Sequence, residues 1–218
     1  MVRQVFPSPV GKPRIMFETL KATSVYQKNK TAWFFSKEDP RWRLSNMAGE
    51  MTVYWPLLRS NPNRWNSSEQ LYQATKYGSE VMCLPAANPG ADPCVRRRIR
   101  EQGAARGAKM TQKCAVSAGL VRKDWDDPQT EVRIQSMLWV LELKLYWNPM
   151  TFGRELAATV ELPIVEISKK DEFWGCKDSG DGSLQGSNVL GKLLMDVRSR
   201  LEPVKRGQFT SPQGWLLP

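Results

Sequence analysis

Two segments of the chain carry apolar residues at helical spacing. In residues 129–147, the apolar side chains that share one helical face are Ile134, Met137, Leu138, Leu141 and Leu145. In residues 188–201, they are Leu190, Leu193, Leu194, Val197 and Leu201. A repeat at i, i+3, i+4 and i+7 is typical of a helix with one buried face. We therefore predict two core helices, the second of them capped by Ser187.

A third helix has a clear start signal. Ser67 and Gln70 have the spacing of a capping box, in which the serine accepts a hydrogen bond from the helix and the glutamine reaches back. This signal predicts a helix over residues 67–80. Further short helices are predicted over residues 94–102, 103–117 and 152–159.

Three short runs rich in β-branched and aromatic residues predict strands: 31–35 (TAWFF), 51–55 (MTVYW) and 162–168 (LPIVEIS). Residues 58–66 and 175–187 are rich in turn-forming residues and are predicted to be loops. Helices outnumber strands, and the strands are scattered among them. The pattern favours an α+β fold, a mostly helical single domain with a small β-sheet.

The length of the chain favours one domain with extensions. It has 218 residues, and one compact domain occupies about 150. Residues 1–30 contain three prolines and an excess of basic side chains, which predicts an N-terminal extension. Residues 202–218 are predicted to form a C-terminal tail. The domain itself is therefore expected over residues 31–201.

The charge is strongly basic and unevenly spread. The formal net charge is +10, from 32 basic and 22 acidic side chains, and nine basic residues with a single acid fall within residues 96–123. This excess predicts an anionic partner, namely a nucleotide-type substrate, DNA or RNA. A solvated helical surface is the alternative interpretation.

The absence of histidine excludes Ser-His-Asp and Cys-His catalytic sites and imidazole metal ligands. The four cysteines lie far apart without a CxxC motif, and the glycine-rich motifs that bind cofactor phosphates are missing. We therefore predict no metal and no other cofactor. The chain has neither a membrane-length apolar run nor a signal-peptide pattern, so we expect an intracellular, cytoplasmic protein, in the host cytoplasm if it is encoded by a virus.

Glu69 is the first candidate for acid–base chemistry. It occupies the first turn of the capped helix, where free N–H groups and the helix dipole attract a carboxylate. Lys76 lies two turns further along the same face, with Tyr72 between them. The alternative interpretation is an ordinary acidic residue in a first helical turn.

A second cluster follows the last predicted strand. Asp171, Trp174 and Gly175 lie in the loop directly after it, and loops at strand ends often carry functional residues. The indole of Trp174 is suited to stack on a heteroaromatic ring. The alternative is a core tryptophan beside a solvated acid. Near the start of the last helix, backbone N–H groups around Gly186 and Asn188 are candidates to hold a phosphate.

Six stretches of the chain resemble motifs of the NADAR family, also called the YbiA-like domain. In chain order they are FFSKEDPRWRLSNM (34–47), SSEQLYQATKY (67–77), the basic stretch through RKDW (122–125), MLWVLELK (137–144), IVEISKKDEFWG (164–175) and GSNVLGKLLMDVRSRL (186–201). The resemblance implies the YbiA-like fold, a compact and mostly helical α+β domain with a small sheet.

The resemblance also implies cleavage of N-glycosidic bonds. Some NADAR proteins act on phosphorylated ribosylamino-pyrimidine intermediates of riboflavin synthesis, and others remove ADP-ribose from modified guanine in nucleic acid. Because the chain is basic, we predict an N-glycosidase that removes an ADP-ribosyl group from guanine in DNA or RNA. The alternatives are an N-glycosidase for the riboflavin intermediates and a non-catalytic module that binds ADP-ribose or nucleic acid.

The resemblance and the residue pattern together predict one site. Glu69 and Asp171 form the predicted carboxylate pair, and Lys76 or Lys37 is the predicted amine nucleophile. Lys76 is also a candidate to hold a phosphate. The nucleophilic lysine of some NADAR proteins aligns with Ser36, one position before Lys37. The predicted substrate-binding residues are Asn46, Tyr72, Trp125, Trp174, Gly175, Gly186, Asn188, Arg106 and Lys109.

Overall fold

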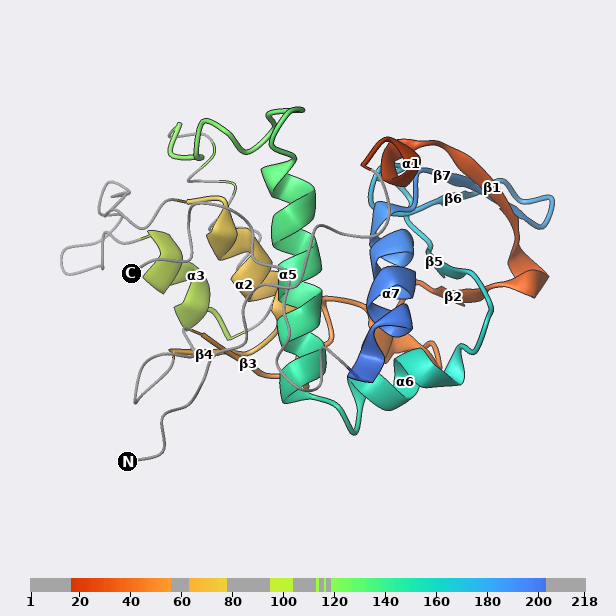
Figure 1. Cartoon of the computed structure of the whole chain (residues 1–218), viewed down its shortest axis with the longest axis horizontal. Coiled ribbons are helices and arrows are strands. Elements are labelled where there is room, and N and C mark those ends of the chain that lie inside the picture. Colours follow the sequence, from red (N-terminus) through yellow and green to blue (C-terminus); the bar gives the residue numbers. More distant parts are fainter. Residues whose placement is uncertain are drawn as a thin grey trace.

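Helices α5 (Val132–Trp147) and α7 (Val189–Ser199) pack against each other at the centre of the fold in the computed structural model of the chain (Figure 1). The structure describes residues 17–55, 63–77, 95–103, 113, 116 and 119–202. Both helices lie within the segments predicted from apolar periodicity. The two helices form the frame on which the other elements are arranged.

Four more α-helices lie within the described residues: α1 (Phe17–Lys21), α2 (Ser68–Thr75), α3 (Val95–Glu101) and α6 (Phe152–Ala158). Two single 3₁₀ turns, η1 (Lys28–Lys30) and η2 (Trp42–Leu44), also lie in this part of the chain. In Figure 1, α2 and α3 lie on one side of α5, and α7, α6 and α1 lie on the other. The predicted helix over 103–117 lies almost wholly outside the described residues.

The strands of the described chain are short: β1 (Ser24–Gln27), β2 (Ala32–Phe34), β3 (Val53–Trp55), β4 (Asn63–Trp65), β5 (Ile164–Glu166), β6 (Lys177–Asp178) and β7 (Ser183–Gly186). They form three small sheets. Strands β2 and β5 pair in parallel, β3 and β4 pair antiparallel, and β1, β7 and β6 form an antiparallel sheet in that order. The architecture is therefore α+β, as predicted, with three small sheets in place of one.

Helix α5 is buried on nearly all sides. Its buried residues run without interruption from Ser136 to Leu145 and include two charged side chains, Glu142 and Lys144. A helix of this kind belongs inside a protein rather than on its surface. The carboxylate of Glu142 is 2.6 Å from the guanidinium of Arg200, at the end of α7. This ion pair gives the buried acid a partner and joins the two central helices.

Helix α2 begins at the predicted cap. The Oγ atom of Ser67 accepts a hydrogen bond of 3.2 Å from the backbone N–H of Gln70. The side chain of Gln70 reaches back to the N–H of Asn66, at 2.7 Å, one residue before the position that a standard capping box uses. The helix ends at Thr75, and residues 78–94 lie outside the described part of the chain.

Helix α7 begins differently from the prediction. Its N-cap residue is Asn188, which has a left-handed backbone (φ 50°), and the hydroxyl of Ser187 donates instead to the backbone oxygen of Lys21, at 2.8 Å. The amide of Asn188 donates to the oxygen of Ile164, at 2.8 Å, and accepts from the N–H of Glu166, at 3.3 Å. These bonds fasten the start of α7 to β5.

The N-terminal extension predicted over residues 1–30 contains regular structure from Phe17 onward. Strand β1 pairs with β7, with Tyr26 opposite Leu184. Helix α1 contacts α7, and the ammonium of Lys192 donates to the backbone oxygens of residues 19, 20 and 22, at 2.7 to 3.1 Å. This part of the predicted extension is thereby integrated into the fold.

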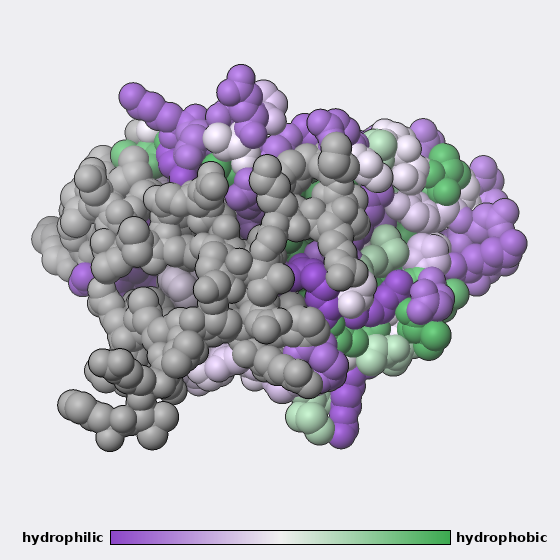
Figure 2. Space-filling model, in the orientation of Figure 1, coloured by the Kyte–Doolittle hydropathy of each residue, from purple (hydrophilic) through white to green (hydrophobic). Residues whose placement is uncertain are grey.

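The visible surface of the described residues is largely hydrophilic. Figure 2 shows polar side chains over most of the coloured surface on that face, with small apolar areas between them. No helix among the described residues is both long and apolar enough to cross a membrane.

Candidate functional site

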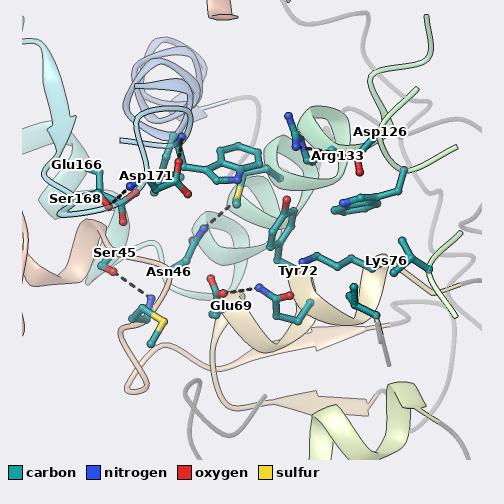
Figure 3. Close-up of a pocket in the computed structure, with 18 of the residues that line it drawn as sticks. Ser45, Asn46, Glu69, Tyr72, Lys76, Asp126, Arg133, Glu166, Ser168 and Asp171 are labelled. Carbon is teal, nitrogen blue, oxygen red and sulfur yellow. Dashed lines mark hydrogen bonds and ion pairs between the residues drawn. The ribbon is translucent and has the colours of Figure 1, made fainter. Parts of the chain in front are cut away.

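A cavity of about 780 Å³ lies between α2, α5, the loop after β5 and the segment that precedes α5 (Figure 3). Its lining comes from five separate parts of the sequence: the turn that follows η2, helix α2, residues 116–137, the strand and loop from Glu166 to Trp174, and Leu190 on α7. The cavity thus lies where the two halves of the chain meet.

Glu69 enters the cavity from the first turn of α2. Its side chain is buried, and its Oε1 atom accepts a hydrogen bond of 2.7 Å from the side-chain amide of Gln73, one turn later. The backbone N–H of Glu69 donates to the backbone oxygen of Asn46, at 3.1 Å. The positive end of the helix dipole also attracts a carboxylate at this place. Glu69 is therefore held in place both by the helix start and by Gln73.

Asn46 lies beside Glu69 and is buried. Its Oδ1 atom accepts a hydrogen bond of 2.9 Å from the hydroxyl of Ser68, and its Nδ2 atom lies 2.9 Å from the sulfur of Met137. Asn46 therefore joins the turn after η2 to both α2 and α5. Its side chain faces the centre of the cavity (Figure 3).

Lys144 on α5 holds the turn that carries Asn46. Its Nζ atom donates to the three backbone oxygens of residues 43–45, at 2.8 to 3.4 Å, and lies 4.2 Å from the centre of the Phe152 ring. The side chain is fully buried. Burial lowers the pKa of Lys144 to about 7, because the charged form loses its hydration.

Asp171 reaches the cavity from the loop after β5. Its Oδ1 atom accepts the backbone N–H groups of Phe173, at 3.0 Å, and Trp174, at 2.9 Å. The N–H of Asp171 donates to the hydroxyl of Ser168, at 3.0 Å. Asp171 is exposed, whereas Glu69 is 6% exposed. These two carboxylates, of the four that line the cavity, therefore have different surroundings.

Three aromatic residues form one wall of the cavity. The ring centre of Tyr72 lies 5.6 Å from that of Trp125 and 5.7 Å from that of Trp174. Burial, followed by the negative charge of Glu69, raises the pKa of Tyr72 well above its usual value. Its phenol therefore stays protonated at neutral pH. Flat rings in this arrangement suit a base or the apolar face of a sugar.

Two cations also line the cavity. The Nζ atom of Lys76 lies 5.8 Å from the ring centres of both Tyr72 and Trp125. Arg133, in the first turn of α5, lies with its guanidinium carbon 4.1 Å from the centre of the Phe173 ring and donates to Asp126, at 3.0 Å. The cavity thus combines carboxylates, aromatic rings and cations.

The family model of the NADAR domain matches residues 33–202. The chain belongs to the NADAR domain family.

Several relatives of this NADAR domain have names that describe an activity. The chain is 30% identical to the riboflavin biosynthesis protein VVA0006 of Vibrio vulnificus over 138 residues, which cover 63% of this chain and 31% of that protein. It is 29% identical to the N-glycosidase Npun_R5314 of Nostoc punctiforme over 139 residues, which cover 63% and 74%. It is 27% identical to the N-glycosidase YbiA of Shigella boydii over 168 residues, which cover 77% and 86%.

The fold is also similar to a solved structure. The NMR structure of the E. coli protein YbiA aligns with a TM-score of 0.56 and 25% sequence identity, over 80% of this chain and 90% of that chain. The chain spans about a third of the Vibrio relative and about three quarters of the Nostoc relative.

Most of the predicted site residues of this NADAR domain line the cavity. They are Asn46, Glu69, Tyr72, Lys76, Trp125, Asp171 and Trp174. Arg106 and Lys109 lie outside the described residues. Lys37 does not line the cavity: its side chain is 78% exposed and lies 3.9 Å from Glu38.

Three other predicted binding residues lie where the backbone is tightly packed, outside the cavity lining. A Cβ atom at Gly175 would be 2.6 Å from the oxygen of Glu166, and one at Gly186 would be 2.4 Å from the oxygen of Gly175. The amide of Asn188 bonds the backbone of β5, as described above. The structure thus gives each of these residues a packing contact of its own.

The cavity also contains residues that the sequence analysis did not select. They include Gln73, Arg133, Glu166 and Ser168. Glu166 lies within the strand predicted over residues 162–168 and Arg133 lies within the helix predicted over residues 129–147, so neither stood apart from its element in the sequence. Within the described residues, no group of three or more Cys, Asp and Glu side chains is placed to hold a metal ion.

Proposed function

We propose that this NADAR domain is an N-glycosidase, which hydrolyses the bond between ribose C1 and a nitrogen of a base or amine. The observation that carries the proposal is the pair of carboxylates on one cavity, with Glu69 buried and Asp171 exposed, beside a wall of aromatic rings. Relatives from Nostoc and Shigella that carry the name N-glycosidase support it.

Hydrolysis of an N-glycosidic bond requires stabilisation of a positive charge and transfer of protons, and two carboxylates can divide these two roles. Breaking the C1–N bond leaves positive charge on the ribose ring, and a nearby carboxylate stabilises that charge. Water then adds to C1, a carboxylate accepts its proton, and the departing nitrogen takes up a proton. We assign the charge-stabilising role to Glu69, because the helix start and Gln73 hold it in place. Asp171, at the solvent side, is the group that meets water.

A lysine is the alternative nucleophile. An amine can attack the aldehyde of an opened sugar and form an imine. Among the described lysines, Lys76 is the one that lines the cavity, whereas Lys37 points into solvent. We therefore propose Lys76 as the site of any imine. Borohydride reduction during turnover, followed by peptide mass spectrometry, locates the adduct.

Two substrate classes fit the proposal. The net charge of +10 favours an ADP-ribosyl group on guanine in nucleic acid. The names of the Vibrio relative and of the Arabidopsis thaliana relative, which is 34% identical over 116 residues, favour a phosphorylated ribosylamino-pyrimidine instead. The first candidate stays our leading proposal, because the basic stretch over residues 96–123 exceeds what one phosphate requires.

Mass spectrometry of the products tests the proposal. The wild-type protein is incubated separately with an oligonucleotide that carries ADP-ribosylated guanine and with a ribosylamino-pyrimidine phosphate. Release of free ADP-ribose supports the first substrate class, and release of ribose phosphate supports the second. Binding of either compound without any release contradicts the proposal and identifies a non-catalytic binding module.

A further inference from the structure

The charged residues that line the cavity are unevenly spread. In Figure 3, Asp171 and Glu166 lie on one side, Lys76 and Arg133, with its partner Asp126, lie on the other, and Tyr72 stands between them. A ligand with a negative group at one end of its length is therefore oriented by the site itself. Its anionic group is attracted to the cations and repelled by the carboxylates.

The positive charge of Arg133 has fewer carboxylate partners than that of Arg200. Its one hydrogen bond among the described residues goes from Nη1 to Asp126, and the two side chains are 36% and 71% exposed. Exposed pairs of this kind contribute little stability. Arg200, by contrast, is 11% exposed and bonds two buried carboxylates, those of Glu142 and Asp196. Most guanidinium N–H groups of Arg133 thus have no partner in the described part of the chain.

The orientation of the Arg133 side chain is set by its packing. The guanidinium carbon lies 4.1 Å from the ring centre of Phe173, which is the distance of a cation–π contact. Such stacking covers one flat face of the group and leaves its edge, with paired N–H donors, for a phosphate. Arg133 lines the cavity, so a phosphate inside the cavity can reach it.

The same packing connects Arg133 to the loop that carries Asp171. Phe173 donates its backbone N–H to Asp171.

We propose that Arg133 forms a subsite for a phosphate group of the substrate, on the side of the cavity that α5 lines. The inference builds on the proposed N-glycosidase and adds the direction in which the substrate lies. The ribose C1 is placed near Glu69 and Asp171, and the phosphate is placed at the guanidinium of Arg133. Both substrate classes carry a phosphate, so the subsite serves either.

Equilibrium binding of two simple probes tests this subsite without any turnover. Ribose 5-phosphate and ribose are titrated into the wild-type protein and into the Arg133→Gln, Arg133→Lys and Arg154→Gln variants, with isothermal calorimetry as the readout. Arg154 is an exposed arginine on α6 outside the cavity lining and is the matched control. Circular dichroism confirms that each variant is folded.

The wild type is expected to bind ribose 5-phosphate more tightly than ribose. Arg133→Gln should weaken binding of the phosphate by about tenfold or more and leave ribose binding unchanged, because a charge-assisted hydrogen bond is lost. The affinity of Arg133→Lys for ribose 5-phosphate should lie between those of the wild type and Arg133→Gln, since lysine keeps the charge and lacks the paired N–H donors of a guanidinium. Arg154→Gln should bind ribose 5-phosphate as the wild type does.

Equal affinity of the wild type for the two probes, or no detectable binding of the phosphate, overturns the proposal. It is also overturned if Arg133→Gln binds ribose 5-phosphate as tightly as the wild type, in which case Arg133 only joins Asp126 to Phe173. A protein that binds the phosphate through Arg133 but releases no product keeps the subsite and removes the glycosidase. The two proposals therefore fail separately.

Discussion

Glu69 and Asp171 reach one cavity from different kinds of local structure. Glu69 is fixed by a helix start that Ser67 predicts in the sequence, and Gln73 supports it from the next turn. Asp171 is fixed by a turn in which its own carboxylate accepts two backbone N–H groups. Each acid thus accepts local hydrogen bonds with one carboxylate oxygen and also lines the cavity.

The change Asp171→Asn separates these two roles. The asparagine side chain keeps an oxygen that can accept the two N–H groups, while the negative charge is lost. We expect turnover to fall by about 100-fold or more, which is typical for a lost proton-transfer group, with little change in the melting temperature. Steady-state kinetics and thermal melting measure the two effects.

The control for this change is Glu172→Gln, at the exposed neighbouring acid that pairs with Lys177 outside the cavity lining. It removes the same charge from the same loop and should leave turnover near that of the wild type. If Asp171→Asn and Glu172→Gln behave alike, Asp171 has no part in the reaction.

At the scale of elements, the sequence was most informative where a segment is rich in apolar residues. Helices α5 and α7, and strands β2, β3 and β5, lie within their predicted segments, and each of them contributes apolar residues to the core. Strands β6 and β7 were predicted as loop, because their residues are mostly polar and they pair through the backbone. The pairing of β1 with β7 joins residues about 160 apart in the chain, which periodicity cannot detect.

The contact between α7 and β5 gives a test of packing. A Cβ atom at Gly191 would lie 2.1 Å from the backbone oxygen of Ile164, so Gly191→Ala forces the helix and strand apart. We expect a loss of about 1–3 kcal/mol of stability from overpacking, or roughly 2–4 °C of melting temperature for each kcal/mol. Alanine in place of glycine otherwise stabilises a helix. A lower melting temperature of Gly191→Ala therefore indicates the close contact, and a higher one indicates that it is absent.

Gly49→Ala is the matched control for this prediction, because a Cβ atom there meets nothing within 4 Å. Differential scanning calorimetry should show a lower melting temperature for Gly191→Ala alone. An unchanged or higher melting temperature of Gly191→Ala would mean that α7 and β5 do not approach each other closely at this position.

Lys144 links helix α5 to the turn before Asn46, and it predicts a dependence of stability on pH. Its pKa is about 7 in the fold and about 10.4 in an unfolded chain. Between these values the unfolded chain holds a proton that the folded protein has released. The contribution of Lys144 to the free energy of unfolding should therefore rise with pH from 7 toward 10 and level off above the unfolded pKa.

Denaturant unfolding of the wild type and of Lys144→Met, measured at pH 7, 8.5 and 10, isolates this contribution. Methionine keeps much of the volume of the side chain and does not titrate. The difference in unfolding free energy between the two proteins should change with pH in favour of the wild type. A difference that stays constant over this range contradicts the lowered pKa of Lys144.

For the whole molecule, the site is an assembly that no single segment contains. The motifs in the sequence led to Asn46, Glu69, Tyr72 and Asp171, which come from three elements and meet in the cavity. They did not lead to Arg133, which lies on a helix between two motifs and gains its place only through packing on Phe173. The motif position of Asn188, conversely, lies in the contact between α7 and β5 rather than in the cavity.

The charge of the whole molecule and the charge of the cavity differ. The chain carries +10, whereas the described charged residues that line the cavity are two cations, Lys76 and Arg133, and four acids, Glu69, Asp126, Glu166 and Asp171. A net positive chain attracts a polyanion from a distance. The carboxylates inside suit a reaction that develops positive charge on a sugar.

The measurement that tests this account most directly compares the turnover of wild type, Glu69→Gln and Glu161→Gln on whichever substrate the wild type cleaves. Glu161 is an exposed acid outside the cavity lining, and circular dichroism checks that each variant is folded. The account predicts that Glu69→Gln loses about 100-fold to 10,000-fold in kcat, while Glu161→Gln keeps the activity of the wild type. A folded Glu69→Gln variant with the kcat of the wild type would contradict it.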